Sequence, residues 1–160
     1  MADTAAVSSG VVEMLKEDHE KVKGLFEDFE SAEGREQADI AATAIMELEV
    51  HADLEEKLIY PAIREEIDEN EMMNEAVEEY HLVHVLITEL KKLKAKDEVF
   101  QAKFKVLGEL VKYHIEEEEG EMLPKAQESD IDGEKLETAV MKRREMMTGK
   151  LSGQKKTSKR

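Results

Sequence analysis

Apolar residues recur every three or four positions through four long stretches of this chain, and that spacing gathers them on one side of a helix. The stretches cover about residues 8–32, 36–66, 71–94 and 97–124. Gly34 lies in the first short break, and Asp97 stands where it can cap the start of the last stretch. Four amphipathic helices joined by short loops predict an all-α fold, an antiparallel up-down-up-down four-helix bundle.

The composition favours helices and excludes several kinds of site. The 160 residues include only 8 glycines, 2 prolines and 4% aromatic residues, so the chain is poor in residues that form turns and strands. There is no cysteine, which excludes disulfides, cysteine-ligated zinc, iron–sulfur clusters and thiol nucleophiles. A chain of this length is enough for one domain with its own core.

Four parts are expected along the chain. They are a flexible N-terminus over residues 1–9, the bundle over 10–126, a partly helical C-terminal extension over 127–150, and a disordered basic tail over 151–160. The net charge of −16 is uneven, because residues 142–160 carry +7 and the preceding residues carry −23. An acidic body repels nucleic acid and anionic membranes, so neither is an expected partner. The basic tail is either a solubilising end or a contact for nucleic acid, an anionic surface or an acidic partner.

The sequence shows no sign of a membrane span or a secretory signal. No run of 18 apolar residues is present, and residues 1–10 lack the basic and apolar regions of a signal peptide. We therefore expect a protein of a reducing cytoplasm, whose oligomeric state these features leave open.

A repeat of about 63 residues runs through the four stretches. Residues 51–56 (HADLEE) recur as residues 114–119 (HIEEEE), and each of the two prolines follows the histidine of its copy by ten residues. Upstream, residues 15–19 match residues 77–81 at an offset of 62. The bundle therefore looks like two copies of one helical hairpin. Each copy supplies a histidine from its first helix and a His-x-x-x-Glu pair from its second.

Ionisable residues interrupt the apolar side of these helices. His51 and Glu55 lie one turn apart on one face, and so do His114 and Glu118. Burying a carboxylate without a partner costs several kcal/mol, so two facing carboxylates need positive charge between them. A pair of metal ions supplies that charge, with carboxylates bridging the ions and neutral imidazoles in terminal positions. Nitrogen and oxygen ligands without sulfur suit iron, manganese or zinc.

All the histidines of the chain belong to this constellation: His19, His51, His81, His84 and His114. In the third stretch, which is apolar almost all round, Val77, His81 and His84 are expected to share the inward face. His84 lies at the edge of that face, so it either binds metal or only packs and hydrogen-bonds. Two other metal-binding patterns are excluded. Only residues 78–81 match the Glu-x-x-His motif that ferritin-like proteins use twice, and the zincin motif His-Glu-x-x-His is absent.

Over about residues 11–126 the chain resembles the hemerythrin-like domains that carry the HHE signature. The resemblance rests on Asp-His19-Glu, His51-x-x-x-Glu55-Glu-x-x-x-Tyr60-Pro61, Glu-Tyr-His81 and His114-x-x-x-Glu118-Glu-x-x-x-x-Pro124. It implies a four-helix bundle that holds two iron ions in a non-haem, oxo- or hydroxo-bridged centre. It also implies a ligand set: His19, His51, His81 and His114, with Glu55 and Glu118 as bridges and His84 as a candidate fifth histidine.

Two features depart from the oxygen-carrying hemerythrins. Their third-helix histidines are four residues apart, whereas His81 and His84 are three apart. Their second bridging carboxylate is an aspartate five residues after the last histidine, whereas here Glu118 stands at four and Glu119 at five. The internal repeat with Glu55 favours Glu118. These departures point away from reversible oxygen carriage and towards the sensing and iron-handling branch.

The resemblance implies a protein that binds O2 or NO at the di-iron centre for sensing or storage, rather than a dedicated enzyme. The alternative is a protein that detoxifies peroxide or oxidises and handles Fe(II). A third hypothesis is structural, with zinc or no metal holding the bundle together. Tyr60 and Tyr80 lie near the ligands in sequence, and each donates a hydrogen bond, binds metal or, as is commonest, fills a bundle end.

Overall fold

The computed structural model describes the backbone of residues 4–158 and the side chains of residues 10–150. The elements are α1 (Thr4–Ser31), α2 (Gly34–Leu54), the π-helical turn η1 (Glu55–Ile59), α3 (Tyr60–Glu66), α4 (Asn70–Leu90), α5 (Glu98–Glu117), the π-helical turn η2 (Glu118–Met122), α6 (Leu123–Gln127) and α7 (Gly133–Ser158). Residues 4–158 contain no strand, which confirms the all-helical prediction.

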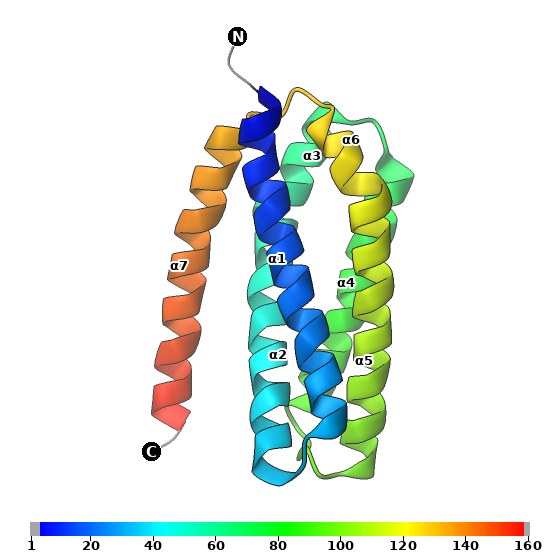
Figure 1. Cartoon of the computed structure of the whole chain (residues 1–160), viewed down its shortest axis with the longest axis vertical. Coiled ribbons are helices and arrows are strands. Elements are labelled where there is room, and N and C mark those ends of the chain that lie inside the picture. Colours follow the sequence, from blue (N-terminus) through cyan, green and yellow to red (C-terminus); the bar gives the residue numbers. More distant parts are fainter. Residues whose placement is uncertain (1–3, 159–160) are drawn as a thin grey trace.

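The long helices lie side by side and alternate in direction along the chain. In Figure 1, α1 descends from the N-terminal end and α2 returns upward into α3; α4 then descends, and α5 rises into α6. The loops are short. Gly34, with a φ of 57°, forms the turn between α1 and α2 in a conformation that favours glycine. Asp97 stands at the N-cap position of α5 but makes no side-chain hydrogen bond to the helix; its carboxylate accepts one from the Lys94 backbone N–H (3.1 Å) in the preceding loop.

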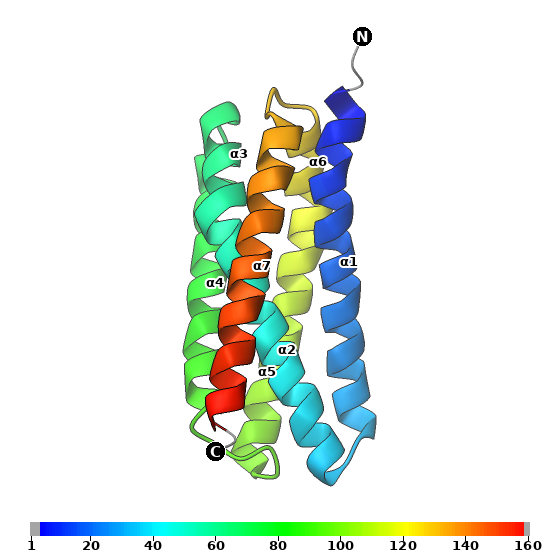
Figure 2. The same ribbon diagram turned by 90° about the vertical axis from the view of Figure 1, so that its left-hand side faces the viewer.

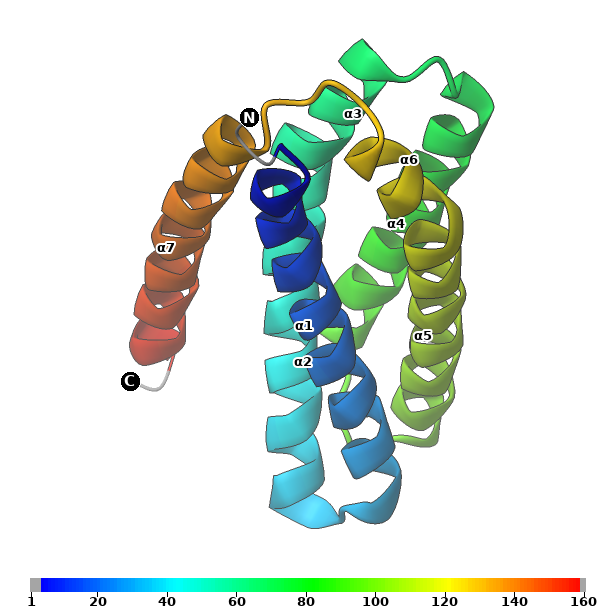
Figure 3. The same ribbon diagram turned by 45° about the horizontal axis from the view of Figure 1, so that its top comes forward.

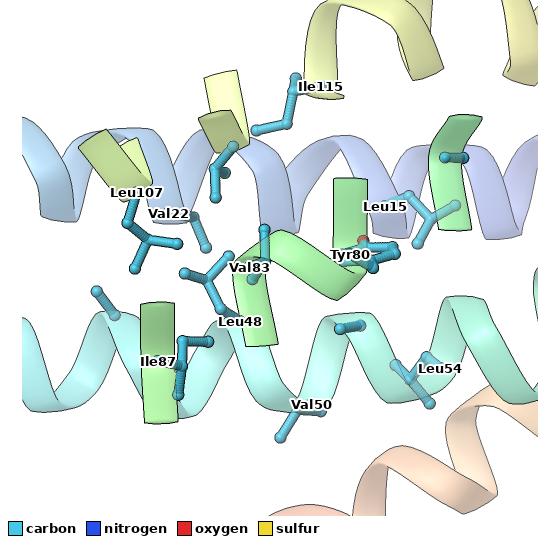
Figure 4. Close-up of a cluster of buried hydrophobic side chains, with 14 of the residues drawn as sticks. Leu15, Val22, Leu48, Val50, Leu54, Tyr80, Val83, Ile87, Leu107 and Ile115 are labelled. Carbon is cyan, nitrogen blue, oxygen red and sulfur yellow. The ribbon is translucent and has the colours of Figure 1, made fainter. Parts of the chain in front are cut away.

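The core lies between these helices. Figure 4 shows Val22 of α1 facing Leu48 of α2 beside Val83 of α4, and Leu15 of α1 facing Leu54 of α2. Towards the α1–α2 loop the core becomes aromatic, and the rings of Phe29 and Phe104 lie 4.2 Å apart between centroids. Residues of this core are almost fully buried, so the helices are held mainly by their apolar faces.

The C-terminal helix α7 packs lengthwise against α1 and α2, on the side away from α4 and α5 (Figures 2 and 3). Its Val140 is completely buried in this contact. The helix begins within the extension that was expected to be partly helical, residues 127–150, and its apolar residues find a partner surface on the bundle.

At the two chain ends, residues 4–9 belong to α1 and residues 151–158 continue α7. Both stretches extend helices that are already docked on the bundle, and elongating a formed helix is easier than starting one. The flexible N-terminus over residues 1–9 and the disordered basic tail over 151–160 stay predictions, and residues 1–3 and 159–160 lie outside the described residues.

Candidate metal centre

Each of the two π-helical turns begins at a predicted ligand, Glu55 in η1 and Glu118 in η2. A proline follows each glutamate by six residues, at Pro61 and Pro124. Proline has no N–H to donate, and its ring clashes with the carbonyl four residues earlier, which here lies inside the π turn. Widening the helix at that point relieves the clash. The clash explains why a proline follows each glutamate at the same spacing. π turns of this kind are frequent at functional sites.

Four buried side chains from different elements converge at the middle of the bundle. They are His19 of α1, His51 of α2, Glu55 of η1 and Glu118 of η2, and one ligand atom of each lies within 4.8 Å of all the others. Glu55 and Glu118 are 0% and 1% exposed. His51 Nε2 lies 2.7 Å from Glu55 Oε1, and His19 Nε2 lies 3.4 Å from Glu118 Oε1.

His114 of α5 adjoins these four residues. Its Nε2 lies 3.0 Å from Glu118 Oε2 and 3.9 Å from Glu55 Oε1. We call the five residues the buried cluster: His19, His51, Glu55, His114 and Glu118. They are five of the seven side chains that the sequence predicts as ligands.

Each imidazole of the buried cluster has a carboxylate behind it. The Nδ1 atoms of His19, His51 and His114 lie 2.9, 3.0 and 2.7 Å from carboxylates. These carboxylates belong, in the same order, to Glu119, Asp18 and Glu79. Hydrogen bonds at Nδ1 fix the orientation of each ring and turn Nε2 inward. A carboxylate behind an imidazole whose other nitrogen faces the ion is the usual arrangement of metal-binding histidines.

The sequence left Glu118 and Glu119 as alternative bridging residues, and the structure gives them different positions. Glu118 lies inside the buried cluster. Glu119 lies outside it and accepts the hydrogen bond of His19. The structure therefore favours Glu118 over Glu119 as a ligand.

Two tyrosines complete the inner ring of polar groups. The hydroxyl of Tyr60 donates to Glu118 Oε2 (3.0 Å) and lies 2.9 Å from His114 Nε2. The hydroxyl of Tyr80 donates to Glu55 through a short hydrogen bond. Burial and the neighbouring glutamates raise the pKa of both tyrosines well above the usual value, so both are neutral donors. Neither tyrosine merely fills a bundle end, which was the commonest role expected from the sequence.

Helix α4 does not bring His81 to the buried cluster. The predicted inward face of Val77, His81 and His84 is wrong, because Val77 and His81 are exposed. The buried face of α4 is spaced by three and four residues: Met73, Ala76, Tyr80, Val83, Ile87 and Leu90. Tyr80 therefore occupies the position expected for His81. His84 is half-buried and contacts Glu56 through Nε2 (2.9 Å), outside the buried cluster.

The first helices of the two halves, α1 and α4, correspond at an offset one residue smaller than the offset of 62 that the sequence comparison gave. In α1, Asp18 contacts the next histidine of the site and His19 points inward. In α4, Glu79 likewise contacts a histidine of the site, His114, and Tyr80 points inward to Glu55. The first helices of the two halves therefore match at an offset of 61, so that Asp18-His19 corresponds to Glu79-Tyr80.

Several polar atoms of the buried cluster make no well-aligned hydrogen bond, although His51 Nε2 and His19 Nε2 lie 2.7 and 3.4 Å from carboxylate oxygens. These polar atoms are His19 Nε2, His51 Nε2, Glu55 Oε2 and Glu118 Oε1. All four belong to the residues whose ligand atoms converge. Buried polar atoms without good hydrogen bonds are costly, and cations among these four would satisfy them together. The donor set of nitrogen and oxygen fits iron, manganese or zinc.

Protons take up part of the negative charge in the metal-free protein. Burial lowers the pKa of His51, but Glu55 and the contact with Asp18 outweigh it and raise that pKa to about 10. Burial also lowers the pKa of His114, and its contacts with Glu118 and Glu79 raise it to about 10. Both imidazoles must release a proton before they bind a cation, so protons and metal compete for this site.

Two cavities adjoin the buried cluster. One is a space of about 20 Å³ beside the three imidazoles and Tyr80, lined also by apolar side chains: Val22, Leu48, Val83, Val111 and Ile115. It is large enough for a molecule the size of water. The other is a surface pocket of about 210 Å³ lined mainly by glutamates, and it reaches His114 and Glu118. The cluster thus has a small apolar space on one side and an acidic approach on another.

Sequence reasoning missed four residues that contact the buried cluster or its supports: Asp18, Glu79, Glu119 in its supporting role, and Arg144. A signal existed for Glu79. The regular spacing from Met73 to Leu90 places Tyr80 inward, and Glu79 then stands beside it as Asp18 stands beside His19. Arg144 is distant in sequence, and no local pattern connects it to the site.

No helix within residues 4–158 combines the length and the hydropathy that crossing a bilayer requires. The part of the chain that the structure describes therefore offers no candidate membrane span.

Comparisons with known proteins agree with this geometry. Residues 10–126 match the family model of the hemerythrin HHE cation binding domain. Among solved structures, the chain superimposes with a TM-score of 0.77 on a hemerythrin HHE cation binding domain-containing protein from Mycobacterium kansasii. The two are 23% identical, and the match covers 100% of this chain and 96% of the other. At that identity the likeness establishes the fold alone. No curated protein sequence matches the chain.

Proposed function

The chain belongs to the hemerythrin HHE cation-binding domain family, and on that premise we propose that its buried cluster holds two iron ions and binds a small molecule, O2 or NO, beside them for sensing or storage. Glu55 and Glu118 are the proposed bridging ligands, and His19, His51 and His114 the terminal ones. The antiparallel bundle of α1, α2, α4 and α5 is the proposed frame that holds them. His81 leaves the ligand set because its side chain is exposed.

The observation that carries this proposal is the convergence of four buried residues, whose ligand atoms lie within 4.8 Å of one another and include several without a well-aligned hydrogen bond. Two carboxylates that lie this close repel each other, and burial together with Glu118 raises the pKa of Glu55. Two cations between them would remove that repulsion and leave both carboxylates ionised. Iron would supply a redox-active centre at which a diatomic ligand binds.

The residues around the site have separate tasks. Glu119, Asp18 and Glu79 hold the three imidazole rings with Nε2 inward. The protonated hydroxyls of Tyr60 and Tyr80 donate hydrogen bonds to the carboxylates of Glu118 and Glu55, respectively. The small volume of the cavity, about 20 Å³, limits a ligand to a few atoms.

A second function, iron handling or peroxide removal, is favoured by the acidic pocket of about 210 Å³ that reaches His114 and Glu118. Glutamates along this approach attract cations such as Fe(II) and give them a route to the site. A protein that handles iron or turns over peroxide needs such an open route, whereas a protein that only binds a gas does not.

Anaerobic reconstitution with Fe(II) separates these functions. The reduced protein is mixed with one equivalent of O2 or NO, or with excess hydrogen peroxide, while its absorption spectrum and the consumption of the reagent are followed. A stable stoichiometric spectrum with O2 or NO, without sustained consumption, supports ligand binding. Continued consumption of peroxide or of added Fe(II) beyond the bound iron supports the second function. Failure to bind iron at all overturns both.

A further inference from the structure

Helix α7 lies outside residues 10–126, which match the family, yet it is firmly attached to the bundle. It runs along α1 and α2 (Figure 2), with Val140 buried and Leu136 and Met147 packed on the core. Residues 142–144 of its basic segment, Lys-Arg-Arg, lie about midway along it. Two of these three residues contact the bundle through their charged groups.

The two arginines make nearly the same contact with two different aspartates. Arg143 binds Asp53 of α2 through Nε and Nη2, with Nη2 donating to Oδ1 at 3.1 Å. Arg144 binds Asp18 of α1 through Nη1 and Nη2, with Nη1 donating to Oδ1 at 3.0 Å. Both are two-pronged contacts of the kind that fix a carboxylate in one orientation. Both also anchor α7, so as anchors they are equivalent.

Only one of the two aspartates, Asp18, also contacts a residue of the buried cluster. Asp18 Oδ2, which Arg144 holds, lies 3.0 Å from His51 Nδ1. His51 Nε2 in turn lies 2.7 Å from Glu55 Oε1. Within the described residues, the side chain of Asp53 hydrogen-bonds to Arg143 alone. A chain of contacts therefore leads from α7 to the cluster through Arg144 and has no counterpart through Arg143.

From this chain of contacts we infer that Arg144 is a positioning residue of the metal site, which couples the docking of α7 to occupation of the site by metal. The inference rests on the proposed function, because it requires that the buried cluster binds a cation. By holding both oxygens of Asp18, Arg144 leaves the carboxylate one orientation in which to accept from His51. That orientation fixes the imidazole with Nε2 inward.

Coupling of this kind acts in both directions. If docked α7 favours metal binding, bound metal must favour docked α7 by the same factor. The C-terminal helix is then the part of the protein through which a change at the site reaches the surface. A lysine at position 144 keeps the charge but has no planar fork, so it holds only one oxygen of Asp18 at a time.

The test compares Arg144→Gln with Arg143→Gln in the full chain, because the two substitutions remove the same charge and one α7 anchor each. Co(II) alone is the probe. Its affinity is measured by competition with a chelator, and its absorption spectrum reports the ligand geometry. We expect Arg144→Gln to weaken Co(II) binding about tenfold and to alter the spectrum, since loss of a group that orients a ligand typically costs ten- to a hundredfold. Arg143→Gln should stay within about twofold of the parent protein and keep its spectrum.

Amide hydrogen exchange in α7 supplies the second measurement. Metal should slow exchange in α7 of the parent protein and of Arg143→Gln, but not of Arg144→Gln. Arg144→Lys should fall between the parent protein and Arg144→Gln. If Arg144→Gln loses helicity in circular dichroism, Arg144→Lys against Arg143→Lys makes the same comparison.

Three outcomes overturn the inference. Equal effects of the two arginine substitutions on Co(II) affinity would show that Arg144 only anchors α7. Metal-independent exchange in α7 of the parent protein would show that the helix and the site are not coupled. A parent protein that binds no Co(II) and no iron would overturn the proposed function along with the inference.

Discussion

The two arms of the buried cluster, His51 with Glu55 and His114 with Glu118, are built alike on the inside and differ on the outside. Each arm places a histidine and a glutamate one turn apart, begins a π turn at the glutamate and has a carboxylate behind the histidine. Behind His51, however, Asp18 is held by Arg144 of α7. Behind His114, Glu79 lines an acidic surface pocket.

This difference shows which parts of a repeated site are constrained. The inner groups must converge on one point, so both halves of the chain keep the same spacing of histidine, glutamate and proline. The outer groups only need to hold a ring in place, so their surroundings can diverge. One arm is closed by an added helix, and the other faces an approach for cations.

Removing an imidazole from either arm should abolish metal binding. His51→Ala and His114→Ala each take one partner from a buried glutamate, and breaking such a buried pair costs about 3–5 kcal/mol of stability. Metal per chain and thermal melting measure both effects. His81→Ala and His84→Ala are the matched controls from α4, and they should keep full metal content. An arm whose histidine can be removed without loss of metal is not part of the site.

The metal-free protein should become less stable as the pH rises above neutrality. The pKa values of His51 and His114 are raised to about 10, so the stability that their protons provide is complete below pH 6.5 and is lost as the pH rises through about 10. Thermal melting from pH 6 to 10.5 measures this loss. Each single His→Ala variant should lose part of the dependence. The metal-loaded protein should lack it, because bound imidazoles are already neutral; an equally steep fall with metal bound would contradict the assignment.

Removing a tyrosine hydroxyl should destabilise each arm by a similar amount. Tyr80→Phe takes a donor from Glu55, and Tyr60→Phe takes one from Glu118. Hydrogen bonds to charged groups contribute about 1.5–3 kcal/mol, so each variant should lose stability in that range in urea unfolding of the metal-free protein. Tyr113→Phe, on the exposed surface of α5, is the control. If Tyr80→Phe behaves like that control, the hydroxyl of Tyr80 does not hold Glu55.

Neutralising the outer carboxylates should separate the two arms. Asp18→Asn and Glu79→Gln each weaken the hold on one imidazole, and we expect a loss of metal affinity of about ten- to a hundredfold in each. Only Asp18→Asn should also loosen α7, because only Asp18 binds Arg144. Chelator competition measures the first effect, and hydrogen exchange in α7 the second. Loosening of α7 by Glu79→Gln would remove the proposed difference between the arms.

Much of this arrangement is predictable from the sequence. The spacing of three and four residues predicts the long helices, and the paired His-x-x-x-Glu motifs predict the side chains that η1, η2, α2 and α5 bring together. The repeat of histidine and proline signals that the two halves match. What the repeat does not reveal is why the proline is there, because a π turn depends on how the helix packs around it.

The error at His81 has a simple physical cause. Adjacent residues on a helix are separated by about 100° of rotation, so a register error of one residue exchanges an inward side chain for an outward one. Aligning the repeat on identical residue types paired His19 with His81, whereas the structure pairs His19 with Tyr80. Because α4 is apolar almost all round, its hydrophobic pattern alone did not correct this choice. Arg144 was out of reach for another reason, since its contact with Asp18 joins residues 126 positions apart.

The most direct test of the account is the metal content per chain of the protein reconstituted with Fe(II), compared with that of Glu118→Ala carried through the same procedure. The account predicts about two irons per chain in the parent protein, retained through dialysis, and loss of that iron in the variant. Helical circular dichroism of the variant shows whether the bundle survives. A parent protein that retains no iron, or a folded Glu118→Ala variant that retains as much as the parent, would contradict a metal centre built on the buried cluster.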